Sequence, residues 1–320
     1  MFLHLSIALL ISVILTLLLY PKLIAFLLKI KYQQTTSEYS LDTYKEKVGT
    51  PTMGGILFVL IPVIVTVILF FNQLDNLKLW IIILAFLGYA VIGFIDDYII
   101  VIQRDNRGIP AKVKFVIQIA LAIIFYFIYQ DSLLSTIAIP FTSIVIDFGI
   151  FYFLIVLLMF VGTTNAVNIT DGMDGLAAGL SFLAIIPFLI FAIIQSEYAI
   201  AGLLIALIGG LIGYLRYNLH PAKIFMGDTG SLALGAVLAA SALVLKQEIA
   251  LIIIGGVFVY EVLCVIIQIG SVKLRKKRVF KYTPIHYSFI ISGATEKQVV
   301  RCFWLAGLIL SIIGVLIMIL

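Results

Sequence analysis

The sequence predicts an all-α integral membrane protein that crosses the bilayer about ten times. Of its 320 residues, 63% are hydrophobic and only 12% are charged, whereas soluble domains are nearer half apolar and one quarter charged. A helical span needs about 20 apolar residues, so about 200 apolar positions are enough for about ten spans. The strands of a membrane β-barrel alternate apolar and polar residues, and the long uninterrupted apolar runs exclude that class.

Apolar runs separated by polar breaks define the expected helices in chain order. The first run begins at Phe2, with no basic region before it and no small-residue cleavage site after it, so we interpret it as a span and not as a signal peptide. The expected spans are 2–28, 54–71, 79–98, 113–129, 148–164, 176–194, 199–217, 230–245, 249–271 and 299–319. No repeat or soluble insertion interrupts them, so residues 1–320 are expected to form a single transmembrane catalytic domain.

The breaks between the runs alternate in charge, which predicts the orientation of the chain. Of the 21 lysines and arginines, only Lys78 and Lys246 fall in the second, fourth, sixth and eighth breaks. Basic loops face the cytoplasm, so the other set of breaks is expected there and both termini outside. The expected cytoplasmic segments are 29–47, 104–114, 165–174, 216–228 and 273–297. The net charge of +5 therefore indicates orientation, and no nucleic-acid partner is expected.

Unusual polar sequence is concentrated in these cytoplasmic breaks, beginning with residues 47–55 (KVGTPTMGG). Glycine and proline allow turns there, and Lys47 with two threonine hydroxyls is a suitable partner for phosphate or sugar. An ordinary helix start capped by Thr52 is an equally good interpretation.

Asp96 and Asp97 end the third expected span. Adjacent carboxylates at the end of an apolar helix are costly to desolvate, repel one another and are disfavoured by the helix macrodipole. This favours a functional pair, neutralised by a metal, basic groups or water, over a solvated helix end. Lys112 and Lys114 open the next span, where basic residues commonly serve topology alone.

Two further loops combine acidic, amide and glycine residues. Residues 165–175 (NAVNITDGMDG) offer hydrogen-bond acceptors and backbone donors, as a nucleotide or metal site requires, without the spacing of an EF-hand. Residues 218–231 (NLHPAKIFMGDTGS) place Asp228 at a helix start, where backbone N–H groups meet phosphate and the carboxylate can hold a divalent cation. Phe225 either stacks on a base or anchors the chain at the interface.

The last third of the chain adds a basic run at 273–278 and two polar residues within the ninth span. The basic run serves as an orientation signal or attracts anionic headgroups. Glu261 and Gln268 are seven residues apart and share a helix face. An acid within the membrane is a functional candidate, although a hydrogen-bonded structural glutamate fits almost as well.

Every carboxylate-rich motif thus falls on the cytoplasmic side. This predicts chemistry between a water-soluble reactant and a lipid, whereas a transporter would place its polar site at the bilayer midplane. In their order and spacing, residues 47–55, Asp96-Asp97, 168–175 and 218–231 together resemble the bacterial phospho-N-acetylmuramoyl-pentapeptide transferases. These belong to the polyprenyl-phosphate N-acetylhexosamine-1-phosphate transferase superfamily, and the resemblance covers essentially the whole chain.

The resemblance implies a ten-span enzyme of the bacterial cytoplasmic membrane, expected as a homodimer. Its activity would be the Mg²⁺-dependent transfer of phospho-N-acetylmuramoyl-pentapeptide from the UDP conjugate to undecaprenyl phosphate, giving lipid I and UMP. Two alternatives stay open: transfer of N-acetylglucosamine-1-phosphate by a sister enzyme, and ion-coupled transport. We expect direct attack, because a phosphate oxygen is already ionised and gains little from a covalent relay.

The resemblance also implies roles for particular residues. Asp228 would bind magnesium, and the expected catalytic set is Asp96, Asp97, Asp228 and His286. The residues expected to bind the substrates are Lys47, Thr52, Lys114, Asn168, Asp171, Asp174, Asn218, Phe225 and Gln268.

The chain departs from the family pattern at its closing motif. The family usually shows three successive histidines followed by an aromatic residue and an acid, whereas residues 286–290 here read HYSFI. His286 matches the first histidine, and the roles of the other two cannot be transferred. Met173 replaces the commoner leucine of its loop, a swap that conserves volume.

Overall fold

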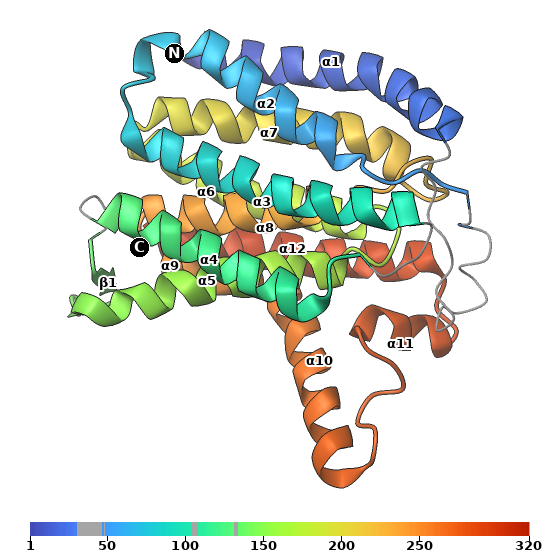
Figure 1. Cartoon of the computed structure of the whole chain (residues 1–320). Helices are drawn as coiled ribbons and strands as arrows, with labels where there is room; N and C mark the ends of the chain where they lie inside the picture. The colour runs from blue at the N-terminus through green and yellow to red at the C-terminus, as the bar shows by residue number, and fades with distance from the viewer. Residues whose placement is uncertain (31–46, 48, 104–107, 131–133, 320) are drawn as a thin grey trace.

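The computed structural model describes residues 1–30, 47, 49–103, 108–130 and 134–319. Its long helices lie side by side in a bundle and run in alternating directions along the chain (Figure 1). The helices are α1 (Phe2–Lys29), α2 (Gly55–Leu69), α3 (Leu77–Gln103), α4 (Ala111–Tyr129), α5 (Tyr152–Thr170), α6 (Leu176–Ile194), α7 (Tyr198–Asn218), α8 (Gly227–Val244), α9 (Glu248–Ile254), α10 (Gly256–Arg275), α11 (Ile285–Ile291) and α12 (Glu296–Ile319). The predicted helical class is confirmed.

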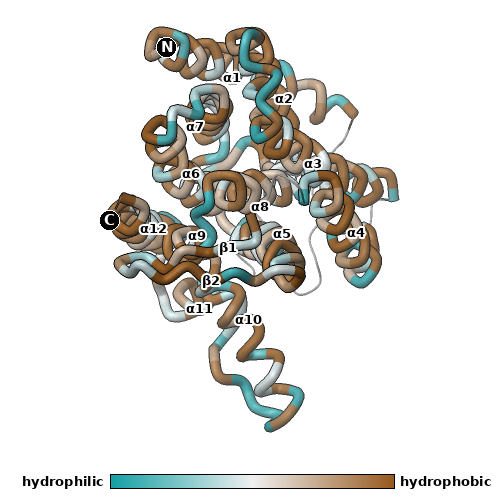
Figure 2. Tube along the Cα trace, turned by 90° about the vertical axis from the view of Figure 1, so that its left-hand side faces the viewer, coloured by the Kyte–Doolittle hydropathy of each residue, from teal (hydrophilic) through white to brown (hydrophobic). Residues whose placement is uncertain are grey.

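Nine of the described helices are long and apolar enough to cross a membrane, and α2, with 15 residues, is a shorter apolar helix. Hydrophobic residues cover most of the length of the helices, and hydrophilic ones gather at the tip of α10 (Figure 2). The chain is therefore a multi-pass membrane protein, as the composition predicts.

The expectation of one continuous helix for the ninth span is wrong. Residues 249–271 are divided between α9 and α10, which meet at Gly255, and α10 leaves the bundle at an angle (Figures 1 and 2). A pair of glycines weakens a helix and allows a sharp change of direction. Because Gly255 and Gly256 lie at the break, the apolar run continues while the helix axis does not.

Other boundaries also differ from the expectation. Helix α5 runs to Thr170, so Asn168 lies in a helix and not in the loop expected at 165–174. Helix α3 runs to Gln103, because residues 99–102 continue its apolar sequence, so Asp96 and Asp97 lie inside the helix and the argument from its C-terminal dipole does not apply. The break at 130–147 contains an antiparallel hairpin of β1 (Thr136–Ala138) and β2 (Val145–Asp147). Helix α11 lies within the loop expected at 273–297.

Helix α8 forms the centre of the bundle. Every residue from Thr229 to Val244 is buried, and most of them are small, which allows membrane helices to approach closely. A Cβ added at Gly93 of α3 would overlap the backbone carbonyl of Asp228. The same addition at Gly235 would overlap the backbone of Thr164 in α5. These contacts fix the start of α8 against its neighbours.

The two termini and the β-hairpin lie at one end of the bundle (Figure 1). The loops that follow α3, α5 and α7 lie at the opposite end, since consecutive helices alternate in direction. The predicted site residues of these loops are therefore gathered at one end. Parts of two expected cytoplasmic segments, at 31–46 and 104–107, lie outside the described residues.

Candidate active site

Asp228, in the first turn of α8, is the point where three helices meet. Its Oδ2 lies 2.5 Å from Lys114 Nζ of α4, and its Oδ1 accepts a hydrogen bond of 2.7 Å from Asn168 Nδ2 of α5. The Asn168 amide also donates to Ser231 Oγ at 2.9 Å. The Asp228 side chain keeps 20% of its surface exposed, so the carboxylate is both held in place and accessible.

The adjacent Asp96 and Asp97 are both buried, but they have different partners. Asp96 accepts a hydrogen bond from the backbone N–H of Ile109 at 2.6 Å, and its Oδ2 lies 3.1 Å from Lys114 Nζ. Lys114 therefore bridges the carboxylates of Asp96 and Asp228.

Asp97 caps α8 from a different helix. One oxygen accepts from the backbone N–H of Asp228 at 3.0 Å. The other accepts from the N–H of Thr229 at 3.0 Å and from its hydroxyl at 2.6 Å. The first N–H groups of a helix have no partner within it and form the positive end of its dipole. The Asp97 carboxylate therefore satisfies two of these donors and fixes the backbone that carries Asp228.

Asp171 follows α5 and completes what we call the aspartate cluster, defined as Asp96, Asp97, Asp171 and Asp228. The pKa of Asp171 is raised to about 8, chiefly by burial and also by the charges of Asp228 and Asp97, while the charge of Lys47 opposes them. A carboxyl group with this pKa is largely protonated at pH 7. The shift therefore reflects burial first, and the neighbouring carboxylates of the cluster add to it.

This donor set fits a magnesium ion. Mg²⁺ prefers oxygen ligands and is commonly held by one or two carboxylates. The partly exposed Asp228 and the nearby Asp171 supply such oxygens, and an added cation would relieve the repulsion that contributes to the raised pKa of Asp171.

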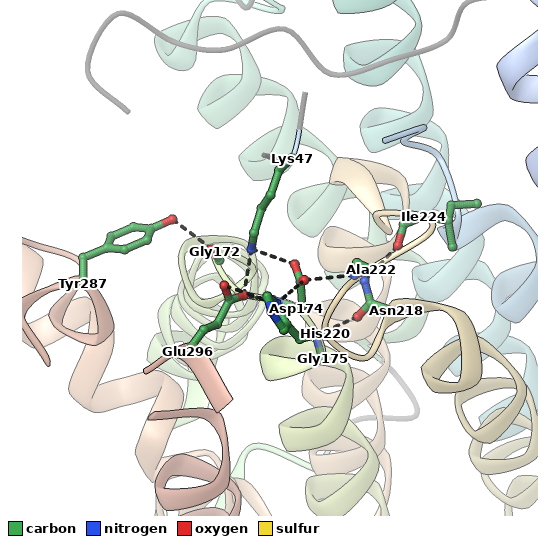
Figure 3. Close-up of polar contacts among 10 residues, drawn as sticks. All are labelled: Lys47, Gly172, Asp174, Gly175, Asn218, His220, Ala222, Ile224, Tyr287 and Glu296. Atoms are coloured by element: carbon green, nitrogen blue, oxygen red, sulfur yellow. Dashed lines mark hydrogen bonds and ion pairs between the residues drawn. The ribbon is translucent and has the colours of Figure 1, made fainter. Parts of the chain in front are cut away.

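A second group of polar and charged side chains, which we call the Lys47 network, consists of Lys47, Asp174, His220 and Glu296 (Figure 3). Lys47 Nζ lies 2.7 Å from a carboxylate oxygen of Asp174 and 2.7 Å from one of Glu296. The second Asp174 oxygen accepts from the backbone N–H of Ala222 and lies 3.0 Å from His220 Nδ1. Glu296 also accepts from the backbone N–H of Asp174 at 2.7 Å.

The network resembles a metal site in its spacing but not in its charge. One ligand atom each from Asp174, His220 and Glu296 lies within 4.8 Å of the others. The Lys47 ammonium already contacts both carboxylates, so it supplies the positive charge that a metal would otherwise bring. We therefore assign this group to an ion-pair network.

Sequence reasoning missed Glu296. In the sequence it is an ordinary acid in the first turn of the last span, beside a local cap in which the Thr295 N–H and hydroxyl donate to Gln298. Nothing local indicates that Glu296 contacts Lys47, which lies 249 residues away. The contact arises because the start of α12 lies beside the loop of residues 171–175 between α5 and α6.

The structure also joins the remaining predicted segments through backbone and amide contacts. Asn218 accepts from the N–H of Gly175 and donates to the carbonyl of Ile224, both at 2.9 Å. The Phe225 N–H donates to Pro51, and the Phe225 carbonyl accepts from Gly54, both at 2.8 Å. The neighbouring Thr52 is buried. The 47–55, 168–175 and 218–231 segments are thus brought together, as the sequence predicts.

The described hydrogen bonds of Gln268 are made with residues 279 and 280. Its amide nitrogen donates to the carbonyl of Phe280, and its oxygen accepts from the N–H groups of Val279 and Phe280, each at 3.0 Å. The described hydrogen bonds of Gln268 thus hold the turn that follows α10. Its predicted contact with the nucleotide remains a prediction.

His286, in contrast, faces the 168–175 loop. It is fully buried on α11, and a Cβ added at Gly172 would overlap its Nε2. Its Nδ1 lies 2.9 Å from the carboxylate of the fully buried Glu261. The structure therefore brings Glu261, a candidate from the sequence, into contact with the predicted catalytic histidine.

Comparison with known proteins agrees with the predicted motifs. The model of glycosyl transferase family 4 matches residues 79–246, and a phospho-N-acetylmuramoyl-pentapeptide-transferase signature matches residues 47–59. A phospho-N-acetylmuramoyl-pentapeptide-transferase of Bacillus subtilis (strain 168) is 44% identical over 305 residues, covering 94% of each chain. That of Halalkalibacterium halodurans is 44% identical over 97% of this chain and 96% of its own. That of Staphylococcus carnosus (strain TM300) is 44% identical over 95% of this chain and 96% of its own.

Proposed function

Because this chain belongs to the phospho-N-acetylmuramoyl-pentapeptide-transferase family, we propose that it transfers phospho-N-acetylmuramoyl-pentapeptide from the UDP conjugate to undecaprenyl phosphate. The products are lipid I and UMP. The observation that carries the proposal is Asp228, held at the start of α8 by Lys114 and Asn168 and still partly exposed. The chain is a bacterial multi-pass membrane protein, which suits a reaction with a lipid acceptor.

The reaction brings two anions together, the lipid phosphate and the UDP diphosphate. The aspartate cluster is itself negative, and Lys114 is already shared between Asp96 and Asp228. A divalent cation is therefore part of the proposal, with Asp228 and Asp171 as the residues that would hold it. Bound magnesium supplies the positive charge that lets the two phosphates approach and stabilises the charge of the leaving UMP.

The residues around Asp228 act by positioning and by charge. Asp97 holds the first turn of α8, and Asn168 orients one oxygen of Asp228. Lys114 lies where it can contact a phosphate oxygen while it remains beside Asp96. Both oxygens of Asp97 accept hydrogen bonds, which supports direct attack by the lipid phosphate over a covalent intermediate on this residue.

We place the nucleotide beside the Lys47 network, because the 47–55, 168–175 and 218–231 segments meet there. Its proposed contacts are Lys47, Thr52, Asp174 and Phe225. Asn218 holds together the loops that carry Asp174 and Phe225. The site then faces the cytoplasm and both termini lie outside, as the distribution of basic residues predicts. A homodimer is part of the proposal.

The test is the release of UMP by purified protein in detergent, with undecaprenyl phosphate and magnesium. UDP-N-acetylmuramoyl-pentapeptide and UDP-N-acetylglucosamine are supplied in parallel. The variants are Asp228→Ala and, as a matched control, Asp147→Ala in the exposed β-hairpin. We expect UMP from the muramoyl substrate alone, lost in Asp228→Ala and retained in the control.

The other results identify the alternatives. UMP from the glucosamine substrate alone would make the chain a sister transferase. No UMP from either substrate would refute the proposal and favour a transporter, whereas activity that survives Asp228→Ala would refute the assignment of the site.

A further inference from the structure

The buried Glu261–His286 pair is the titratable group that the proposed reaction leaves unexplained. Glu261 lies on α10 and His286 on α11, and neither side chain has any exposed surface. Burying two such groups is costly unless their hydrogen bonds are satisfied. The contacts of each atom therefore indicate what the pair does.

Both oxygens of the Glu261 carboxylate contact the segment that carries His286. Its Oε2 accepts from the backbone N–H of Ile285 at 2.8 Å, and its Oε1 lies 2.9 Å from His286 Nδ1. A carboxylate oxygen can only accept, so Nδ1 carries the hydrogen in this contact. The contact thereby sets both the direction of the imidazole ring and the position of its proton.

The opposite ring nitrogen has no such partner. His286 Nε2 is buried without a hydrogen-bond partner in the part of the chain that the structure describes. It points at Gly172, where an added Cβ would overlap it. A buried polar atom without a partner destabilises the protein, and a ligand that supplied the missing hydrogen bond would remove this cost.

Tyr287 holds the same loop from beside the histidine. Its hydroxyl donates to the Gly172 carbonyl at 3.0 Å, as Figure 3 shows. Its ring packs at an angle on that of His286, with 4.1 Å between the centroids. Gly172 is next to Asp171 of the aspartate cluster, so the unpaired Nε2 is directed at the loop that carries one of the proposed magnesium ligands.

We propose that Glu261 is a positioning residue that holds His286 with the hydrogen on Nδ1, so that Nε2 is kept as an acceptor directed at Gly172, in the loop beside the proposed substrate site. The proposal rests on the proposed function for the identity of that substrate. Glu261 acts only through His286, in the manner of a carboxylate that orients a catalytic imidazole. The inference also explains why a glutamate is tolerated within an otherwise apolar span.

Glu261→Gln is the informative substitution. It conserves the shape of the side chain and reverses the direction of its hydrogen bond with His286 Nδ1. The amide oxygen can still accept from Ile285, while the amide nitrogen must donate to Nδ1, which moves the imidazole proton to Nε2. The chain has three histidines, His4, His220 and His286. The NMR spectrum of protein labelled with ¹⁵N in its histidine rings therefore contains few signals. The signals of His286 are those that disappear in His286→Asn.

We expect the His286 signal of the wild type to show a protonated Nδ1 and an unprotonated Nε2, and that of Glu261→Gln to show the reverse. We expect kcat for UMP release to fall roughly 10- to 100-fold in this variant, with KM changed less than about 3-fold. In a His286→Asn background the same substitution should cost nothing further, because the residue through which it acts is absent. Glu261→Asp should retain the Nδ1 proton and recover part of the activity.

Glu248→Gln is the matched control for loss of a buried glutamate. Glu248 contacts Tyr152 and Lys246 at 2.5 Å, near the end of the bundle that carries the β-hairpin. This variant should lower thermal stability without changing the His286 signal. An unchanged His286 signal in Glu261→Gln, or an equal loss of kcat with and without His286, would overturn the inference. Wild-type protein without UMP release would refute the proposed function, while the ring signals would still decide whether Glu261 sets the imidazole proton.

Discussion

Replacing Asp97 with asparagine tests whether this carboxylate caps α8 or reacts with substrate. In the structure it accepts hydrogen bonds from two backbone N–H groups and one hydroxyl at the start of that helix. An asparagine oxygen can keep one side of this arrangement, but its NH₂ group then faces a donor. The variant therefore loses a charge-assisted hydrogen bond and the interaction of the charge with the helix dipole.

The magnitude follows from these two terms. A hydrogen bond to a charged group contributes about 1.5–3 kcal/mol, and a charge at a helix end contributes about 0.3–2 kcal/mol. We expect a loss of about 3 kcal/mol in the free energy of unfolding. At about 2 °C per kcal/mol for a large chain, this lowers Tm by about 6 °C. Activity should also fall, because the backbone that carries Asp228 is no longer fixed.

Thermal unfolding in detergent, followed by circular dichroism, measures the effect beside the rate of UMP release. Asp75→Asn, at an exposed position before α3, serves as the control and should leave Tm unchanged within about 1 °C. If Asp97→Asn kept the wild-type Tm and lost all activity, the cap would be refuted and a direct role of the Asp97 carboxylate on substrate would take its place.

Four other perturbations test other parts of the site. Gly93→Ala places a methyl group against the Asp228 backbone, so Tm and UMP release should both fall, at a cost of at least about 1–3 kcal/mol. Asn218→Ala removes two hydrogen bonds between loops, and unfolding should show a loss of about 1–3 kcal/mol. Glu296→Gln removes one of the two described carboxylate partners of Lys47, so KM for the UDP substrate should rise several-fold with little change in kcat. Chelation with EDTA should abolish UMP release while the helical circular dichroism remains.

Each of these four predictions would be contradicted by a specific result. Wild-type activity in Gly93→Ala would show that α3 and α8 can separate without harm to the site. An unchanged Tm in Asn218→Ala would mean that Gly175 and Ile224 do not depend on its amide. A lower kcat at constant KM in Glu296→Gln would remove the Lys47 network from nucleotide binding. Activity in EDTA would remove the cation from the proposal.

Local sequence was enough to predict the helical membrane class and which loops carry the polar motifs. An uninterrupted apolar run of about 20 residues is stable in a bilayer as a helix, because the hydrogen bonds of all its backbone groups must be made within the segment. The unequal distribution of lysine and arginine assigned five breaks to one side. Both features depend on neighbours in the chain and not on packing.

Only the tertiary structure decided the partners of the individual charges. Asp97 meets the start of α8 across 131 residues, and Lys47 meets Glu296 across 249. Two glycines at 255 and 256 turn the ninth apolar run into two helices, and this break separates α10, which carries Glu261, from α9. Such contacts depend on how closely helices approach at small residues such as Gly93, and side-chain packing of this kind leaves no periodic pattern in the sequence.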